Sequence, residues 1–269
     1  MSASVLLAID IGNTNVSLGV FDGRRGKALS EHWRLSTHRE QTSDEVAVTV
    51  RSLFAAADLP PADVTDVIVS STVPPLLPIW ERVCTKLFDR PPMVVGPGIR
   101  TGMPVRYENP REVGPDRIVN AVAAYELHGG PIIAVDFGTA TTFDCVSEAG
   151  EYLGGAIFPG IHISMEALFE RAAMLHRVEI ARPRSVIGRT TTDSLQSGLL
   201  YGYAGLVDSM VTRIRGELGA AARCIATGGL AHRIAGESAC IERVEPFLTL
   251  EGLRILFDKN RPERKEMTA

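Results

Sequence analysis

Two short segments of this chain place an aspartate and a glycine-containing turn directly after a buried strand. In the first, the apolar run from Val5 to Ile9 leads into Asp10 and a polar turn. In the second, the run from Ile132 to Val135 leads into Asp136, 126 residues later. Glycine lets a backbone approach a ligand, backbone N–H groups and hydroxyls bind phosphate oxygens, and carboxylates can hold a divalent cation. These residue types indicate binding of a polyphosphate with its metal ion.

The two segments match position by position. Ala8 corresponds to Ala134, Asp10 to Asp136, Gly12 to Gly138 and Asn13 to Thr139. Either turn alone is more typical of an ordinary hairpin than of a binding site. A signature that occurs once in each half instead predicts two lobes built on the same plan and facing each other across a cleft. Each lobe would offer one aspartate and one turn to the polyphosphate.

A third candidate site follows an irregular segment in the middle of the chain. Residues 96–115 contain several prolines and glycines and show no periodicity, and such a long loop in a compact protein is usually functional. The segment ends in Gly114-Pro115-Asp116-Arg117, after which apolar residues recur at helical spacing. An acidic first turn is common at any helix start, but the rigid Gly-Pro pair and the long loop favour a functional role for Asp116 and Arg117.

The composition is that of an ordinary globular enzyme. The chain has 269 residues, 45% hydrophobic and 22% charged, and its net charge of -4 gives no reason to expect nucleic acid or an acidic membrane as partner. No targeting segment or membrane-spanning run is recognisable, so we expect a cytoplasmic protein. The four cysteines form no Cys-x-x-Cys pair, which favours small buried side chains over a zinc site or disulfides.

The elements that would position these residues alternate between strands and helices, which is typical of an α/β fold. We expect strands at 5–9, 16–21, 32–36, 64–70 and 93–95 in the first lobe, and a helix that begins near Ser43. The second lobe repeats the strand–turn–strand, adds a strand at 151–157 and a long helix from Thr190, and ends with a helix at 248–257. Gly228 and Gly229 could serve an adenine ring or tight packing, and the sequence leaves both open.

With these three motifs in this order, the chain closely resembles the type III pantothenate kinases over residues 5 to 257. That family belongs to the superfamily of acetate kinase, sugar kinases, Hsp70 and actin. The resemblance implies two similar α/β lobes of the ribonuclease H-like, actin-like type with an interlobe cleft. We expect an N-terminal lobe at 1–117, a C-terminal lobe at 118–257 and a frayed tail at 258–269.

The resemblance also implies an activity, namely ATP-dependent phosphorylation of pantothenate to 4′-phosphopantothenate, the first step of coenzyme A biosynthesis. It implies a cytoplasmic homodimer that requires Mg²⁺ or another divalent cation, and K⁺ or NH₄⁺ as a monovalent cation. Asp116 would be the proton acceptor, and Asp136 would take part in the monovalent cation site. The residues expected to bind ATP are Asp10, Ile11, Gly12, Asn13, Thr14, Asn15, Val16, Ser17 and Thr139. Those expected to bind pantothenate are Tyr107, Gly114, Pro115, Asp116, Arg117 and Thr191.

Two rival functions fit parts of the pattern. A chaperone-like regulator that hydrolyses ATP slowly would use the same two turns, but it would not need Asp116 and Arg117. A different small-molecule kinase, such as a sugar kinase, would use all three motifs with another acceptor alcohol. Phosphoryl transfer requires positioning and charge neutralisation, which the three motifs together supply.

Overall fold

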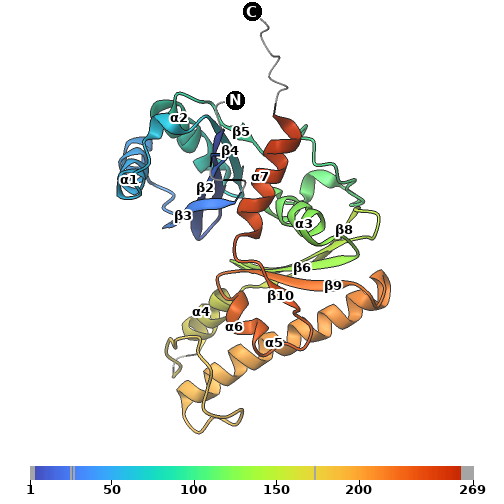
Figure 1. Cartoon of the computed structure of the whole chain (residues 1–269). Coiled ribbons are helices and arrows are strands. Elements are labelled where there is room, and N and C mark those ends of the chain that lie inside the picture. Colours follow the sequence, from blue (N-terminus) through green and yellow to red (C-terminus); the bar gives the residue numbers. More distant parts are fainter. Residues whose placement is uncertain (1–3, 25, 27, 173, 262–269) are drawn as a thin grey trace, which may run out of the picture. The chain divides into compact units, whose positions relative to one another are not determined.

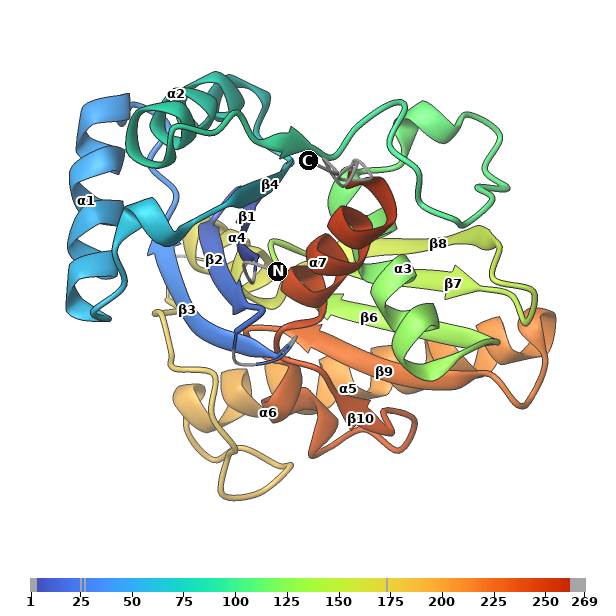
Figure 2. The same cartoon turned by 45° about the horizontal axis from the view of Figure 1, so that its top comes forward.

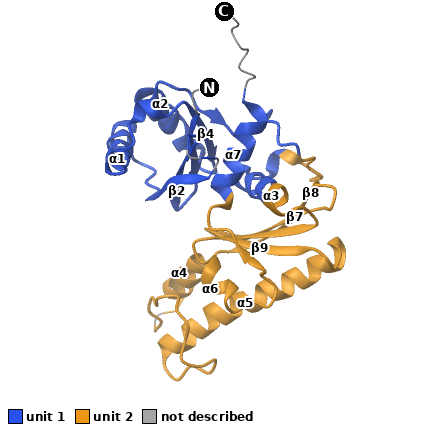
Figure 3. Cartoon of the chain, in the orientation of Figure 1, with its two compact units in different colours: residues 1–102, 111–123, 249–269 blue, residues 103–110, 124–248 orange. Residues whose placement is uncertain are grey.

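The chain divides into two compact units in the computed structural model, which describes residues 4–24, 26, 28–172 and 174–261. Unit 1 comprises residues 1–102, 111–123 and 249–269, and unit 2 comprises residues 103–110 and 124–248 (Figure 3). Each unit is built on one five-stranded mixed sheet (Figure 1). The sequence therefore correctly predicted two α/β lobes of similar plan.

The sheet of unit 1 has the strand order β3-β2-β1-β4-β5. Strands β1 and β2 form an antiparallel hairpin, β3 continues it, and β4 and β5 add in parallel on the other side of β1. The bounds are β1 Val5–Ile11, β2 Asn15–Asp22, β3 Leu29–Ser36, β4 Asp66–Ser71 and β5 Met93–Val94.

Helices cover both faces of this sheet. Helices α1 (Ser43–Ala56) and α2 (Leu77–Phe88) bury Val46, Phe54 and Trp80 against alternate residues of the strands. Helix α7 (Leu248–Asn260) packs on the other face of the sheet (Figure 2). There, a Cβ on Gly19 would lie 2.9 Å from a methyl carbon of Leu250. Because side chains alternate along a strand, the residues of β1 that alternate with those packed under α1 and α2 face the α7 side.

The sheet of unit 2 repeats this order and these directions as β8-β7-β6-β9-β10. Strands β6, β7 and β8 are antiparallel neighbours, and β9 and β10 are parallel to β6. The bounds are β6 Ile132–Phe137, β7 Ala140–Val146, β8 Tyr152–Pro159, β9 Arg223–Gly228 and β10 Arg243–Val244. Helices α5 (Thr191–Leu218) and α6 (Ala231–Ala235) cover the face that carries Ile133, Val135 and Phe137.

The remaining elements connect or border the two sheets. They are helices α3 (Pro115–His128) and α4 (Ile161–Arg171) and the 3₁₀ turns η1 (Pro61–Asp63), η2 (Pro74–Leu76) and η3 (Pro110–Glu112). The N-cap of helix α1 is Thr42, which forms a capping box with Glu45. Among the described residues, no helix combines the length and apolar composition that crossing a membrane requires.

The expected boundary after residue 117 assigns several short stretches of chain to a different unit from the one to which they belong in the structure. Residues 103–110 join unit 2, because Arg106 N donates to Tyr152 O (2.8 Å) and Tyr152 N donates to Pro104 O (2.9 Å). Helix α7 returns to unit 1 and continues to Asn260, so residues 258–260 are helical rather than tail. Residues 262–269 lie outside the part of the chain described.

Candidate functional site

The first aspartate lies at the end of β1, beside a turn that two threonines hold in place. Gly12 N donates to Asn15 O at 3.0 Å and closes the turn. Thr37 Oγ1 donates to Gly12 O at 2.7 Å, and Thr72 N donates to Ile11 O at 2.9 Å. With these carbonyl groups occupied by the protein, the turn is fixed in one conformation. Such fixed backbone is suited to present N–H groups to an anion.

The turn leaves little room for a side chain at Gly12. A Cβ at this position would lie 3.0 Å from the Asn15 carbonyl oxygen, tighter than ordinary van der Waals contact. Asn13 and Thr14 at the tip of the turn are exposed, and Arg39 Nη2 donates to Asn13 Oδ1 at 3.2 Å. The expected ATP-binding residues from Asp10 to Ser17 therefore form one hairpin with an accessible tip.

The carboxylate of Asp10 belongs to a row of polar side chains that crosses three strands. Asp10 lies opposite Ser17 in the β1–β2 pair and opposite Ser70 in the β1–β4 pair. Paired residues of neighbouring strands point to the same face, and this is the face away from α1 and α2. The Ser17–Asp10–Ser70 row thus places a hydroxyl-bearing residue on each side of the carboxylate.

Asp116 lies in the first turn of α3, in unit 1. Gly114 O accepts hydrogen bonds from Arg117 N (3.1 Å) and Ile118 N (3.3 Å) and so begins the helix. A Cβ on Gly114 would lie 2.5 Å from Asp116 Oδ1, so glycine makes room for the carboxylate. Burial raises the pKa of Asp116, although hydrogen bonds from the backbone N–H groups of Arg117 and Asp116 and the charge of Arg117 act in the opposite direction. A carboxylate whose pKa is raised is a stronger base.

Arg117, the next residue, is buried with 7% of its surface exposed. A guanidinium stays charged in such a position and offers several N–H donors in a rigid plane. Arg117 and Asp116 therefore combine a fixed positive charge with a basic carboxylate at one helix start.

The second turn, in unit 2, is one residue shorter than the first. Gly138 and Thr139 separate β6 from β7, whereas Gly12, Asn13 and Thr14 separate β1 from β2. Gly138 N donates to Ala140 O at 3.0 Å, and Thr139 O accepts a hydrogen bond from Gly160 N at 3.1 Å just before α4. Asp136 lies opposite Thr142 on β7 and Thr227 on β9. A second row, Thr142–Asp136–Thr227, therefore repeats the first.

Gly228 packs directly against the second aspartate. With φ at +93°, a Cβ on this residue would lie 2.6 Å from both Asp136 Oδ1 and the Phe137 carbonyl oxygen. The positive φ and the lack of space both require glycine. Of the two roles left open by the sequence, tight packing is what the structure shows for Gly228.

Tyr107 lies on the backbone of β8, also in unit 2. Val105 forms an isolated parallel bridge with Tyr152, and the Arg106 guanidinium pairs with Glu151 Oε1 at 2.6 Å. A Cβ on Gly154 would lie 3.2 Å from Cδ2 and Cε2 of the Tyr107 ring. The edge of β8 thereby sets the position of the ring.

Thr191 is exposed in the first turn of α5. The N-cap is Thr190, whose Oγ1 accepts a hydrogen bond from Asp193 N at 3.1 Å and donates one to Asp193 Oδ2 at 2.8 Å. This cap fixes the start of the helix and leaves the Thr191 hydroxyl at its accessible end.

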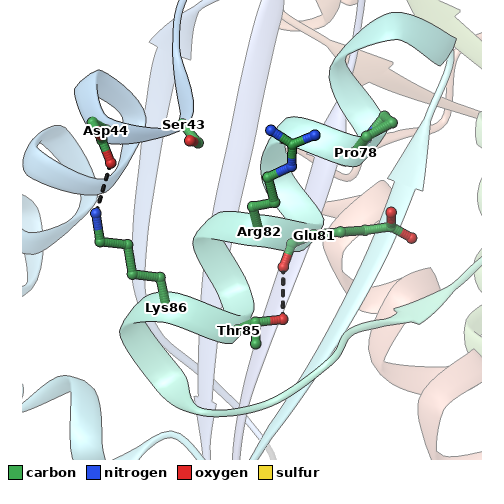
Figure 4. A pocket seen from close by; sticks show the side chains of 7 residues that line it. All are labelled: Ser43, Asp44, Pro78, Glu81, Arg82, Thr85 and Lys86. Atoms are coloured by element: carbon green, nitrogen blue, oxygen red, sulfur yellow. Dashed lines mark hydrogen bonds and ion pairs between the residues drawn. The ribbon is translucent and has the colours of Figure 1, made fainter.

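A cavity of about 550 Å³ lies elsewhere in unit 1, between α1 and α2 (Figure 4). Its lining consists mainly of exposed polar and charged side chains, and Lys86 Nζ pairs with Asp44 Oδ1 at 2.6 Å across it. None of the residues expected to bind ATP or pantothenate lines it. All four cysteines are free thiols, and burial raises the pKa of Cys84 and Cys224 to about 12.

The comparisons with known proteins agree with this architecture. The family model for type III pantothenate kinase matches residues 6–213. The chain belongs to the type III pantothenate kinase family. It is 57% identical to the type III pantothenate kinase of Myxococcus xanthus over 256 residues, covering 95% of this chain and 99% of the relative. It is 52% identical to that of Moorella thermoacetica, covering 95% of this chain and all of the relative.

Solved structures show the same actin-like fold at low sequence identity. The activator of the 2-hydroxyisocaproyl-CoA dehydratase from Clostridium difficile, with bound ADPNP, matches with a TM-score of 0.55 and 13% identity over 94% of each chain. A ROK family glucokinase from Streptomyces griseus, in complex with glucose and AMPPNP, matches with a TM-score of 0.54 and 14% identity over 94% of this chain and 99% of that chain.

The residues present suit the ions that a kinase of this family would use. The described residues contain no group of three or more His, Cys, Asp or Glu side chains placed to hold a metal ion. Each aspartate is instead flanked by hydroxyl-bearing residues, and Mg²⁺ binds to one or two carboxylates, water and the phosphates of its nucleotide. Asp10 with Ser17 and Ser70, and Asp136 with Thr142 and Thr227, are the oxygen-bearing residues that would be available to hold such an ion.

Several residues of these sites were not identified from the sequence. Thr37, Ser70 and Thr72 contribute to the first site, and Gly154 supports Tyr107. Ser70 and Thr72 could have been found from the sequence, because they lie at the carboxyl end of a buried parallel strand. Ligands bind at this end of the strands in α/β sheets. Gly154 could not be found this way, since its neighbour Tyr107 is remote in sequence.

Proposed function

We propose that this kinase phosphorylates pantothenate with ATP and produces 4′-phosphopantothenate, the first step of coenzyme A biosynthesis. The observation that carries the proposal is the match to the type III pantothenate kinase model together with identities of 52–57% over nearly the whole chain. The cytoplasm is the location that we propose for it.

The first hairpin would bind the phosphates of ATP. Residues 10–17 combine a fixed turn, an exposed tip and hydroxyl groups, which are the features of a phosphate-binding loop. Thr139 in the second turn would also contact ATP. A bound Mg²⁺ would neutralise the charge that develops on the phosphates. Asp10 would orient that ion, and Asp136 would take part in holding K⁺ or NH₄⁺.

Asp116 would act as the proton acceptor in the transfer. The pantothenate hydroxyl oxygen attacks the γ-phosphorus of ATP, its proton passes to the Asp116 carboxylate, and ADP leaves as the bond to its β-phosphate oxygen breaks. The partly buried carboxylate with its raised pKa supports this role. Arg117 has the fixed charge to bind either the substrate carboxylate or the moving phosphoryl group.

Residues of both units are assigned to pantothenate binding in this proposal. The residues that we assign to pantothenate, together with Asp116, are Tyr107, Gly114, Pro115, Arg117 and Thr191. The ring of Tyr107 is supported by the β8 edge, and Gly114 and Pro115 begin α3. A homodimer, which the resemblance to the family implies, is the assembly that we propose for this chain.

A substrate panel tests the proposal directly. Purified full-length protein would be incubated with ATP, Mg²⁺ and K⁺ plus pantothenate, glucose, glycerol, acetate or no acceptor, and the products would be identified by mass spectrometry. We expect a phosphorylated product from pantothenate alone. Phosphorylation of a sugar without phosphorylation of pantothenate would show a different small-molecule kinase, and ATP hydrolysis independent of any acceptor would show a nucleotide-dependent regulator. Either result would overturn the proposal.

A further inference from the structure

Ser70, the fifth residue of β4, carries a hydroxyl that is buried without a hydrogen bond. The residue has no exposed surface, and its Oγ has no partner among the described residues. Its neighbour Ser71 differs, since Ser71 Oγ donates to Val73 O and accepts from Val73 N, both at 3.1 Å. A buried hydroxyl without a partner is unfavourable and rare in native proteins. A hydroxyl in this state is suited to a partner that becomes available when a ligand binds.

The strand register places this hydroxyl beside Asp10. Ser70 lies opposite Asp10 in the parallel β1–β4 pair, where neighbouring strands are about 4.8 Å apart. The flanking residue Val69 contributes to the core under α1 and α2, so Ser70 and Asp10 both point to the other face of the sheet. The carboxylate of Asp10 is therefore the charged group nearest in register to the Ser70 hydroxyl.

The same arrangement occurs a second time in the chain. On β9 of unit 2, Thr227 lies opposite Asp136 and is also buried, with 3% of its surface exposed. The strand that lies parallel to the aspartate strand thus supplies a hydroxyl in both units. Side-chain burial does not require this, because the neighbouring positions Val69 and Ala226 are apolar.

We propose that Ser70 is a positioning residue of the nucleotide site. In the nucleotide-bound protein its hydroxyl donates to the Asp10 carboxylate, and the bond fixes which carboxylate oxygen faces the hydrated Mg²⁺ and the phosphates. A hydrogen bond to a charged group is stronger than one between neutral groups. The inference rests on the proposed role of Asp10 in binding ATP, but not on pantothenate as the acceptor.

The test measures stability and nucleotide binding separately. For wild type and Ser70→Ala, thermal unfolding would be followed without ligand, and the Kd of ADP would be measured by calorimetry over a series of Mg²⁺ concentrations. We expect Ser70→Ala to unfold at the same or a higher temperature, because the variant loses a hydroxyl that has no partner. We expect it to bind ADP about tenfold more weakly at saturating Mg²⁺, and to require more Mg²⁺ for half-maximal binding.

Two further variants separate positioning from a structural role. Ser70→Thr keeps the hydroxyl and should restore most of the affinity. Ser71→Ala removes a hydroxyl that is already bonded within the strand end, so it should lower the unfolding temperature and leave the Kd within about twofold. If Ser70→Ala instead lowers the unfolding temperature and leaves the Kd unchanged, the hydroxyl is structural and the inference is wrong.

The outcome can be distinguished from that of the proposed function. A Ser70 effect on ADP binding in a protein that phosphorylates some other alcohol would support this inference and overturn pantothenate as the substrate. Wild-type protein that binds no ADP in the presence of Mg²⁺ would overturn both.

Discussion

The two units have sheets of the same topology, but they differ in the connection that follows the last strand of each sheet. In both, the order and direction of the five strands are the same. In unit 1, β5 is followed by a long connection over residues 95–114 before α3 begins, whereas in unit 2 only residues 245–247 separate β10 from α7. The long connection carries Tyr107 and ends at Gly114. We propose that the repeated scaffold binds the nucleotide and that the long connection supplies Tyr107 and Gly114, two of the residues that we assign to the acceptor.

The helices that follow these connections differ at their second residue. Asp116 holds this position in α3 and Thr249 holds it in α7, where Thr249 Oγ1 donates to Asn120 Oδ1 at 2.7 Å. A carboxylate with a raised pKa is therefore present in one copy and replaced by a hydrogen-bonded hydroxyl in the other. The two copies of the scaffold therefore differ at the position of the proposed base.

Replacing the base gives the largest expected effect. Asp116→Asn should lower kcat by about 100-fold or more, the range for loss of a positioned base. The matched variant Thr249→Val, at the equivalent position of α7, should change kcat by less than about threefold, because the residue is not part of the proposed site. Steady-state kinetics with pantothenate and ATP would measure both. Near wild-type turnover in Asp116→Asn would remove Asp116 from this role.

The same substitution should stabilise the fold at neutral pH. Burial raises the folded-state pKa of Asp116, so the native state binds this proton more tightly than the unfolded state does. The ionised carboxylate therefore destabilises the protein once the pH exceeds both pKa values. Asp116→Asn should unfold at a higher temperature than wild type at neutral pH, with the difference disappearing in acid below both pKa values. A lower unfolding temperature at neutral pH would contradict the assigned burial cost.

The pH profile of the wild-type enzyme reports on the same group. We expect kcat/KM for pantothenate to fall on the acid side, with a pKa above the ordinary aspartate value of 3.8, because protonation removes the base. The loss should approach about tenfold per pH unit below that pKa. The residual activity of Asp116→Asn should lack this limb, and a limb that persists in the variant would belong to another group.

Displacing the Tyr107 ring should weaken binding of the acceptor rather than binding of ATP. Gly154→Ala would place a Cβ 3.2 Å from the Tyr107 ring and would strain a backbone with φ of +108°. We expect the KM for pantothenate to rise about tenfold and the KM for ATP to stay within about twofold, since misplacing a substrate-binding group weakens binding of that substrate.

A helical glycine serves as the control for this variant. Gly198 lies in α5, and a Cβ added to it would have no neighbour within 4 Å. Gly198→Ala should therefore raise stability by about 0.5–1 kcal/mol and leave both KM values unchanged. Equal increases in both KM values for Gly154→Ala would show a general loss of structure instead of a displaced Tyr107.

The smallest expected effect tests whether the two polar rows hold different ions. Thr227→Val removes the hydroxyl opposite Asp136 and keeps the shape of the side chain. We expect the K⁺ concentration for half-maximal activity to rise about three- to fivefold, the loss for one oxygen donor to a weakly held cation. The Mg²⁺ requirement should not change. The opposite pattern would assign the divalent ion to the second row.

The sequence determined the repeat, the strand–turn–strand segments and the fold class. Asp10 and Asp136 follow short apolar runs in the same local pattern, and local pattern decides whether a segment forms a buried strand and a turn. The start of α3 at Gly114 and Pro115 was recognisable for the same reason, since helix-start signals lie within a few residues of each other.

Only the tertiary structure decided which residues stand beside the two aspartates and beneath Tyr107. Ser70 and Thr227 are 60 and 91 residues away in sequence from the aspartates that they face, and Gly154 is likewise remote from Tyr107. Strand register and the return of α7 to unit 1 depend on how distant apolar surfaces pack, for example Leu250 on Gly19. The preference of each residue for helix, strand or turn gives no information on such contacts, because they form only when the whole sheet is assembled.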